Sequence, residues 1–245
     1  MNLIVDAGNT YVKVAVFQGD KMLSHESFEK KLFQKKIEKL LKTHAEIDQM
    51  ITSSVTTFSD DTKQFIANLD LKVHKLTHKT KVPFQNNYAT PETLGVDRIA
   101  LVVAAVAQYP KTNVLVIDAG TCITYDFKTS DEIYLGGGIS PGIQLRYKTL
   151  NLLTANLPLL EPKVPENYIG NTTESAIHSG VTIGVITEID GIIERYKGQF
   201  EHLTVILTGG DTNFLAKRLK NTIFANSKFL LQGLNTILEY NRYND

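Results

Sequence analysis

The sequence lacks several features that would assign it to particular classes of protein. It has one cysteine, Cys122, so an intramolecular disulfide is excluded and a reducing compartment is expected. Lysine plus arginine and aspartate plus glutamate both number 26, so no overall basic field attracts nucleic acid or an anionic membrane. The longest apolar run, Ile99 to Ala107, is about half of what a bilayer requires, and no secretory signal precedes the first expected strand. We expect a cytoplasmic protein with a small-molecule ligand.

Two familiar nucleotide-binding motifs are also missing. No G-x-x-x-x-G-K-[ST] sequence occurs, which excludes a P-loop, and the glycines at 136–142 do not follow a first strand with Rossmann spacing. Any bound nucleotide is therefore held in another way.

The chain does contain an aspartate-glycine turn that occurs twice. Leu3 to Thr10 and Leu115 to Cys122 each end a run of β-type residues, and alternating runs follow at Tyr11 to Phe17 and Ile123 to Phe127. This pattern predicts two hairpins and hence two related halves, 1–110 and 111–245, each with a mixed sheet flanked by helices. Two such turns that face each other would suit phosphates and a metal ion.

The remaining segments alternate between helical and strand-like patterns. The Lys-rich stretch Lys30 to Lys42 predicts an amphipathic helix whose basic face is solvated, in preference to a nucleic-acid site. Further helices are expected at 59–68, 213–219 and 230–238, a loop that leads into a helix at 93–107, and a long helix or helix pair at 171–197. Strands are expected at 50–55, 71–82 and 204–207, and loops at 83–91 and 136–142.

The two turns carry the residue types that phosphate binding requires. In the first, Gly8 allows close backbone approach, Asn9 and Thr10 can donate hydrogen bonds, and Lys13 could reach a terminal phosphate. Taken alone, this turn is better explained as an ordinary hairpin, but the second copy favours a functional role. There, Asp118 could hold a cation and Thr121 could contact phosphate. We expect Cys122 to fill a small apolar site rather than to act as a nucleophile.

Two other groups of residues have both a structural and a functional interpretation. The carboxylate of Asp97 could simply favour a helix start with Arg98 as its partner, or it could act as a general base with Arg98 binding an anionic substrate group. His74 and His78 have helical metal spacing, but they lie in a β-like stretch without a third ligand, so a zinc site is disfavoured.

Five segments together resemble the type III pantothenate kinase family. They occur in the family's order over nearly the whole chain: Asp6-x-Gly8-Asn9-Thr10, Gly95-Val96-Asp97-Arg98, Asp118-x-Gly120-Thr121, Gly137-Gly138-x-x-Pro141-Gly142 and Thr208-Gly209-Gly210. That family belongs to the superfamily of acetate kinase, sugar kinases, heat-shock chaperones and actin. The resemblance implies an α/β fold of two duplicated ribonuclease-H-like (actin-like) halves around a nucleotide cleft.

The resemblance also implies an activity, namely ATP-dependent phosphorylation of pantothenate to 4'-phosphopantothenate, the first step towards coenzyme A. It implies Mg²⁺ and a monovalent cation, K⁺ or NH₄⁺, beside ATP, with Asp118 as the ligand of the monovalent cation. Asp97 would accept the hydroxyl proton. It further implies a homodimer whose interface includes the long helix after Thr173.

The site residues implied by the family match can be assigned position by position. Those at the ATP site would be Asp6, Ala7, Gly8, Asn9, Thr10, Tyr11, Val12, Lys13 and Thr121. Those at the pantothenate site would be Tyr88, Gly95, Val96, Asp97, Arg98 and Thr173. Two departures from the family pattern exist, because no proline follows Ser53-Ser54-Val55 and because Gly170-Asn171-Thr172-Thr173 replaces a Lys-Asn-Thr run. The second leaves open whether Thr172 or Thr173 contacts the substrate.

Two other functions remain compatible with such a fold. One is an ATP-binding regulator, for instance of transcription, which the zero net charge and the absence of a DNA-binding helix pair disfavour. The other is a kinase or phosphatase of the same superfamily that acts on another acid or sugar, which the Gly95 to Arg98 segment disfavours.

Overall fold

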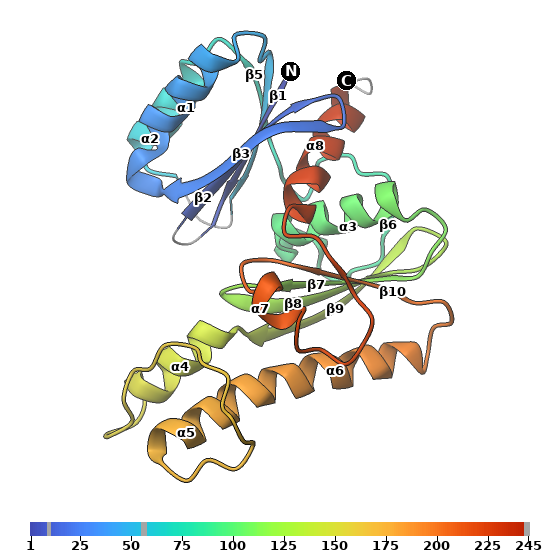
Figure 1. Ribbon diagram of the computed structural model, residues 1–245. Coiled ribbons are helices and arrows are strands. Elements are labelled where there is room, and N and C mark those ends of the chain that lie inside the picture. Colours follow the sequence, from blue (N-terminus) through green and yellow to red (C-terminus); the bar gives the residue numbers. More distant parts are fainter. Residues whose placement is uncertain (9–10, 55–57, 243–245) are drawn as a thin grey trace. The chain divides into compact units, whose positions relative to one another are not determined.

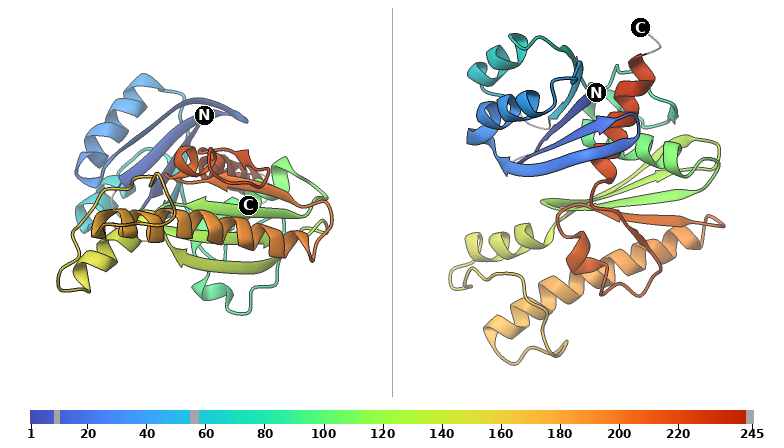
Figure 2. Two further views of the ribbon diagram at one scale, coloured as in Figure 1. Left: turned by 60° about the horizontal axis from the view of Figure 1, so that its bottom comes forward. Right: turned by 45° about the horizontal axis from the view of Figure 1, so that its top comes forward.

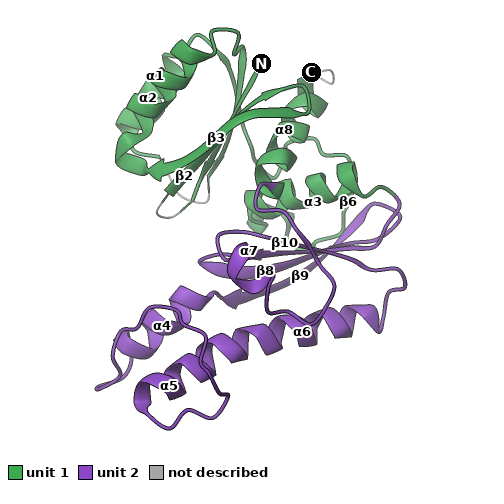
Figure 3. Ribbon diagram, in the orientation of Figure 1, with its two compact units in different colours: residues 1–110, 229–245 green, residues 111–228 purple. Residues whose placement is uncertain are grey.

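The computed structural model of the 245-residue chain describes residues 1–8, 11–54 and 58–242 (Figure 1). The chain forms two compact units (Figure 3). Unit 1 consists of Met1–Pro110 together with Phe229–Asp245, and unit 2 consists of Lys111–Lys228.

Unit 1 is built on a mixed sheet with the strand order β3-β2-β1-β4-β5. The strands are β1 (Asn2–Ala7), β2 (Tyr11–Gln18), β3 (Lys21–Glu29), β4 (Gln49–Ser54) and β5 (Lys72–Lys75). β2 runs antiparallel to both β1 and β3, as the hairpin pattern predicted, whereas β1, β4 and β5 run parallel to one another. Every residue of β1 is buried, because helices cover both faces of the sheet.

Two helices cover one face of this sheet, as Figures 1 and 2 show. They are α1 (Phe33–Thr43), which follows the 3₁₀ turn η1 (Lys30–Leu32), and α2 (Asp60–Ala67). The first confirms the amphipathic helix predicted from the Lys-rich stretch, since Phe33 and Ile37 are buried in the core with Leu3 and Val5 of β1. The second begins at Ser59, whose hydroxyl accepts a hydrogen bond from the Thr62 N–H.

Helices α3 (Val96–Gln108) and α8 (Phe229–Arg242) pack closely against each other, and both contact strands of the sheet. A Cβ on Gly233 would lie 1.9 Å from the carbonyl oxygen of Ala100, so this glycine permits the close approach of the two helices. The buried amide of Asn2 in β1 donates to Asn235 in α8 at 2.8 Å. The last helix thus joins unit 1, whereas the sequence interpretation had grouped residues 229–245 with the second half.

Unit 2 repeats the topology of unit 1. Its strands are β7 (Val114–Ala119), β8 (Cys122–Lys128), β9 (Ile133–Pro141), β10 (Thr204–Thr208) and β11 (Phe224–Ala225). They lie in the order β9-β8-β7-β10-β11, with β8 antiparallel to β7 and β9, and with β7, β10 and β11 parallel. The same order and directions occur in unit 1, so the duplicated α/β fold predicted from the two turns is confirmed.

A long helical run covers the sheet of unit 2 (Figure 2). It comprises α5 (Thr173–His178), a π-helical turn η3 (Ser179–Ile183) and α6 (Gly184–Lys197), and it buries an apolar residue at every fourth position from Ile177 to Ile193. Among the described residues this is the one helix whose length and hydropathy would suit a membrane span. Core helices share those properties, and the buried face of this helix packs into the core of unit 2. Helices α4 (Ile143–Leu152) and α7 (Thr212–Leu215) complete the unit.

Two sequence-based expectations about local structure were wrong. The glycines at 136–141 belong to strand β9 and not to a loop, and helix α4 begins only after Gly142. A Cβ on Gly137 would lie 1.6 Å from the Tyr125 carbonyl oxygen, so close strand packing explains this glycine. Of the expected strand at 71–82, only Lys72–Lys75 pairs with the sheet. The segment at 83–91 holds short elements, β6 (Gln85–Asn86) and the start of η2 (Pro91–Thr93).

Candidate active site

The first turn places Asp6 at the carboxyl end of β1. Asp6 pairs with Lys13 across the hairpin, and the Gly8 N–H closes the turn by donating to the Tyr11 carbonyl at 3.0 Å. Ala7 and Val12 are buried in the core of unit 1, so their side chains cannot face a ligand, whereas Tyr11 is exposed. Asn9 and Thr10, two of the predicted ATP-site residues, lie outside the described residues.

The carboxylate of Asp6 has an unusual electrostatic environment. Its side chain is only 7% exposed, and this burial raises its pKa from 3.8 to about 6. Lys13 opposes the shift, Asp97 adds to it, and the Ser53 hydroxyl opposes it. A buried carboxyl group with charged neighbours is typical of a functional site.

The segment Gly95 to Arg98 forms the start of α3. Asp97 lies in the first turn of the helix, and its Oδ1 accepts a hydrogen bond of 2.9 Å from the Arg98 N–H. A Cβ on Gly95 would lie 2.4 Å from that Oδ1, so glycine is needed for the observed carboxylate position. Asp97 therefore stabilises the helix start, as the structural interpretation held, and remains close enough to Asp6 to influence its charge.

Two predicted substrate-site residues that are separated in the sequence, Tyr88 and Arg98, meet in unit 1. The guanidinium of Arg98 lies over the ring of Tyr88, 5.5 Å from its centroid. Tyr88 is held in turn by its N–H, which donates to Asn86 at 3.0 Å. Arg98 is 5% exposed, so this cation is fixed rather than solvated. Tyr88 thus lies beside the first turn of α3, which carries Asp97 and Arg98.

In unit 2, three glycine-containing segments meet at the second turn. The Gly120 N–H donates to Cys122 at 2.9 Å, and the Gly142 N–H donates to Thr121 at 3.0 Å. A Cβ on Gly142 would lie 2.0 Å from the Gly120 carbonyl oxygen, and one on Gly209 would lie 2.3 Å from Asp118 Oδ1. Gly209 also has φ +97°, a conformation that favours glycine. The turn that contains Asp118 and Gly120 is therefore packed against the backbone of Gly142 after β9 and the backbone of Gly209 after β10.

Two residues beside this turn are exposed. Thr121 presents its side chain to solvent, as phosphate contact would require. Cys122 is also exposed, so the expectation that it fills a small apolar site was wrong. The alternation of β8 explains this result, because Ile123 on the opposite side of the strand takes the core position.

Thr173 lies in unit 2 at the start of α5. Thr172, its neighbour, caps the helix with its hydroxyl, which accepts from the Ser175 N–H at 3.1 Å. Thr173 is exposed and lines a cavity of about 750 Å³ together with Pro141, Arg146 and Gly180. Of the two threonines left open by the sequence, Thr173 is the one that faces this cavity.

One charged network beside the same cavity was missed by sequence reasoning. Arg146 forms an ion pair with Glu188 and donates to Ser140 Oγ at 3.0 Å, while the Tyr125 hydroxyl donates to Glu188 at 3.0 Å. Hydrogen bonds from these groups hold the pKa of Glu188 below its ordinary value despite its partial burial, whereas burial and the Glu188 charge raise the pKa of Tyr125. The residues lie on α4, α6, β8 and β9, and no spacing in the sequence links them.

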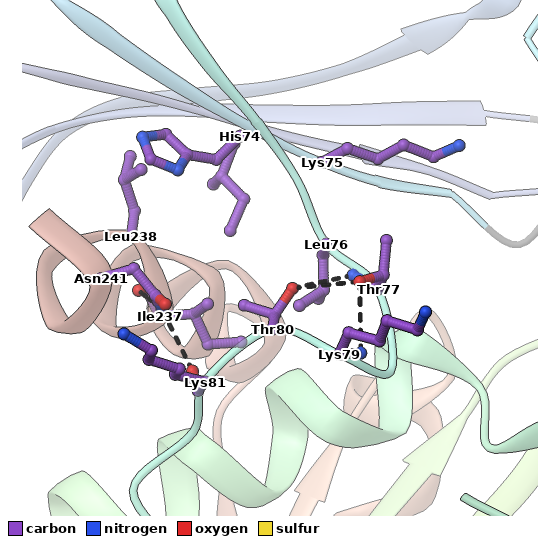
Figure 4. Close-up of a pocket in the computed structure, with 11 residues that line it drawn as sticks. His74, Lys75, Leu76, Thr77, Lys79, Thr80, Lys81, Ile237, Leu238 and Asn241 are labelled. Atoms are coloured by element: carbon purple, nitrogen blue, oxygen red, sulfur yellow. Dashed lines mark hydrogen bonds between the residues drawn. The ribbon is translucent and has the colours of Figure 1, made fainter. Parts of the chain in front are cut away.

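A smaller cavity in unit 1 contains none of the predicted site residues. It has a volume of about 280 Å³ and lies between the segment after β5 and helix α8, with His74 and Leu238 among its lining residues (Figure 4). Within the described parts of the chain, no three histidine, cysteine or acidic side chains gather as metal ligands would.

The residues of the two turns suit ATP and hard cations in their chemistry. Asp118 could supply an oxygen ligand, and the two glycines that pack against its turn, Gly142 and Gly209, add no side chain there. Asp6 and Lys13 supply opposite charges at the first turn. These donors match oxygen-binding cations and phosphate rather than a soft metal, which would require thiolate or imidazole ligands.

Comparison with known proteins identifies the family. Residues 2–195 match the family model described as type III pantothenate kinase. The chain is 52% identical over 242 residues to a type III pantothenate kinase from Christiangramia forsetii, covering 99% of each, and 51% identical over 247 residues to one from Flavobacterium johnsoniae, covering 100% of each.

Solved structures with the same fold include component A of (R)-2-hydroxyglutaryl-CoA dehydratase from Acidaminococcus fermentans. Its TM-score is 0.55 at 12% identity, with 100% of this chain and 99% of that chain covered, a likeness of fold alone. The family match and the relatives that align over nearly the whole chain show the family as well as the fold, and they agree with the order of motifs along the sequence. The chain belongs to the type III pantothenate kinase family.

Proposed function

We propose that this protein phosphorylates the primary hydroxyl of pantothenate with ATP to give 4'-phosphopantothenate, the first step towards coenzyme A. The observation that carries the proposal is membership of the type III pantothenate kinase family over the whole chain. The arrangement at the start of α3 supports it, because a carboxylate, a fixed guanidinium and an aromatic ring lie together there.

Asp97 is proposed as the general base that accepts the proton of the substrate hydroxyl. Its Oδ1 is occupied by the Arg98 N–H, which orients the carboxylate and leaves Oδ2 to face a hydroxyl. Arg98 is proposed to bind the carboxylate of pantothenate by a charge-assisted hydrogen bond, while the Tyr88 ring fixes the guanidinium. Gly95, Val96 and Thr173 are proposed as further substrate contacts.

The phosphates of ATP are proposed to contact the segment Asp6 to Lys13 and the residue Thr121. Phosphoryl transfer depends mainly on alignment and charge neutralisation, so Lys13 and the backbone N–H groups of the turns would stabilise the transferred group. When bound, Mg²⁺ neutralises phosphate charge, and Asp118 is proposed to hold the accompanying monovalent cation, K⁺ or NH₄⁺. We also propose a homodimer that acts in the cytoplasm.

The test is the release of ADP by the purified protein with and without pantothenate, first in K⁺ and then in Na⁺. We expect release that depends strictly on pantothenate and that fails in Na⁺. ADP release without pantothenate, or with another acid or sugar in its place, would reject pantothenate as the specific substrate. Salt-dependent DNA binding without ATP turnover would favour a regulator instead.

A further inference from the structure

Ser53, at the end of β4, has a buried hydroxyl that no assigned role explains. Its side chain is fully buried, and its Oγ forms no hydrogen bond of normal geometry with any described group. A buried polar group without a hydrogen-bond partner destabilises the folded state. Such a hydroxyl is uncommon in a folded protein and often indicates a functional contact.

The sheet places Ser53 directly beside Asp6. The two residues are register partners on the parallel strands β4 and β1, so their side chains project from the same face of the sheet. The hydroxyl is close enough to favour the ionised form of the Asp6 carboxylate. The next residue, Ser54, approaches the same turn through its hydroxyl, 3.5 Å from the Ala7 carbonyl oxygen.

The other charged groups around Asp6 act in opposite directions. Lys13, from β2, favours its ionised form, whereas Asp97, from α3, disfavours it. Burial is the largest influence, and it favours the neutral acid. A carboxylate under these opposing influences is sensitive to one additional hydrogen-bond donor.

We propose that Ser53 is a positioning residue for Asp6: its hydroxyl, which has no other hydrogen-bond partner among the described residues, is the donor available to the neighbouring Asp6 carboxylate and orients it at the phosphate-binding turn. This inference rests on the proposed kinase function for its effect on catalysis. It does not rest on that function for the contact itself, because both residues lie in unit 1 of the folded protein. Ser53 is not among the residues that the family match assigned to the site.

Three variants separate the hydroxyl from other effects. Ser53→Ala removes it, and Ser53→Cys nearly preserves the side-chain volume while supplying only a weak donor. Ser24→Ala is the matched control, because Ser24 also has a buried Oγ without a hydrogen-bond partner but lies on β3 and pairs with Val16. Thermal unfolding of all three checks that the fold is kept.

The first measurement is the carboxyl ¹³C NMR titration of Asp6, assigned with Asp6→Asn. Because the Ser53 hydroxyl lowers the pKa of Asp6, both Ser53 variants should move the titration midpoint to higher pH, and Ser24→Ala should leave it in place. An unchanged midpoint in both Ser53 variants overturns the inference.

The second measurement is kcat/KM for ATP as a function of pH. The acid limb should move to higher pH in step with the midpoint for both Ser53 variants, whereas Ser24→Ala should leave it in place. A shifted midpoint with an unmoved acid limb overturns the positioning role. Wild-type protein that releases no ADP with pantothenate, while the midpoint still shifts, rejects the proposed function and leaves the contact between Ser53 and Asp6 supported.

Discussion

The Asp97 carboxylate raises the pKa of Asp6, although the two residues lie on different elements of unit 1. The topology explains this relationship. Along β1, Leu3 and Val5 face the core under α1 and α2, so Asn2, Ile4 and Asp6 project from the opposite face, where Asn2 bonds to α8. The start of α3 brings Asp97 to the same side. The proposed phosphate site and the proposed catalytic base thus influence each other.

Asp6→Asn should stabilise the protein at neutral pH. The pKa of Asp6 is raised to about 6, so the folded state binds the proton more tightly than the unfolded state, and stability falls as pH rises from about 4 to about 6. A shift of about 2 pKa units corresponds to about 3 kcal/mol, so the variant should gain up to about that much above pH 6 and nothing below about pH 4.

Urea unfolding of wild type and Asp6→Asn across this pH range measures the difference. Asp20→Asn, which changes an exposed carboxylate in the turn between β2 and β3, is the control and should show no such gain. An Asp6→Asn protein no more stable than wild type at pH 7.5 would argue against a buried, strained carboxylate.

Asp97→Asn should lower kcat by about 10² to 10⁴ and leave the ATP affinity largely unchanged. The asparagine oxygen can still accept the Arg98 N–H, so the helix start should survive and the melting temperature should change little. Steady-state kinetics and thermal unfolding measure these effects. Turnover near the wild-type value would remove Asp97 from the mechanism.

Gly95→Ala should reduce turnover without unfolding the protein. The backbone at Gly95 has φ −57° and ψ 131°, which alanine adopts freely, but the new Cβ would lie 2.4 Å from Asp97 Oδ1 and must displace the carboxylate. A displacement of about 1 Å at a reacting group can cost about 10²-fold in rate. Wild-type kcat in Gly95→Ala would show that the carboxylate position is not critical.

Gly233→Ala should destabilise unit 1 by about 1–3 kcal/mol or more, because its Cβ would lie 1.9 Å from the Ala100 carbonyl oxygen and force α3 and α8 apart. The matched control is Gly191→Ala, at an exposed position within α6 where a Cβ has open space. That variant should stabilise the protein by about 0.5–1 kcal/mol. Chemical unfolding of both distinguishes a packing effect from helix propensity.

Asp118→Asn should raise the K⁺ concentration needed for half-maximal activity, since a neutral amide oxygen holds a cation less tightly than a carboxylate. Activity measured over a K⁺ series tests this prediction. Asp131→Asn, which changes an exposed carboxylate in the turn before β9, should keep the wild-type K⁺ response. An identical response in Asp118→Asn would place the monovalent cation elsewhere.

The sequence by itself determined the local architecture. A run of β-type residues before Asp6 and before Asp118, and an alternating run after each turn, predicted both hairpins, since side chains in a strand alternate between faces. The spacing of apolar residues after Gly95 likewise predicted a helix with Asp97 in its first turn. These features depend on neighbours within a few residues, so they are encoded locally.

Only the tertiary structure decided which distant residues meet. It joined α8 to unit 1 through the contact of Gly233 with Ala100, and it placed Ser53 beside Asp6 and Arg98 over Tyr88. It also placed the glycines at 136–138 in strand β9 by pairing them with β8, where the close approach of the Tyr125 carbonyl excludes a side chain at Gly137. Strand order and helix packing determine such contacts, and no local sequence pattern predicts a contact between residues that lie far apart in the chain.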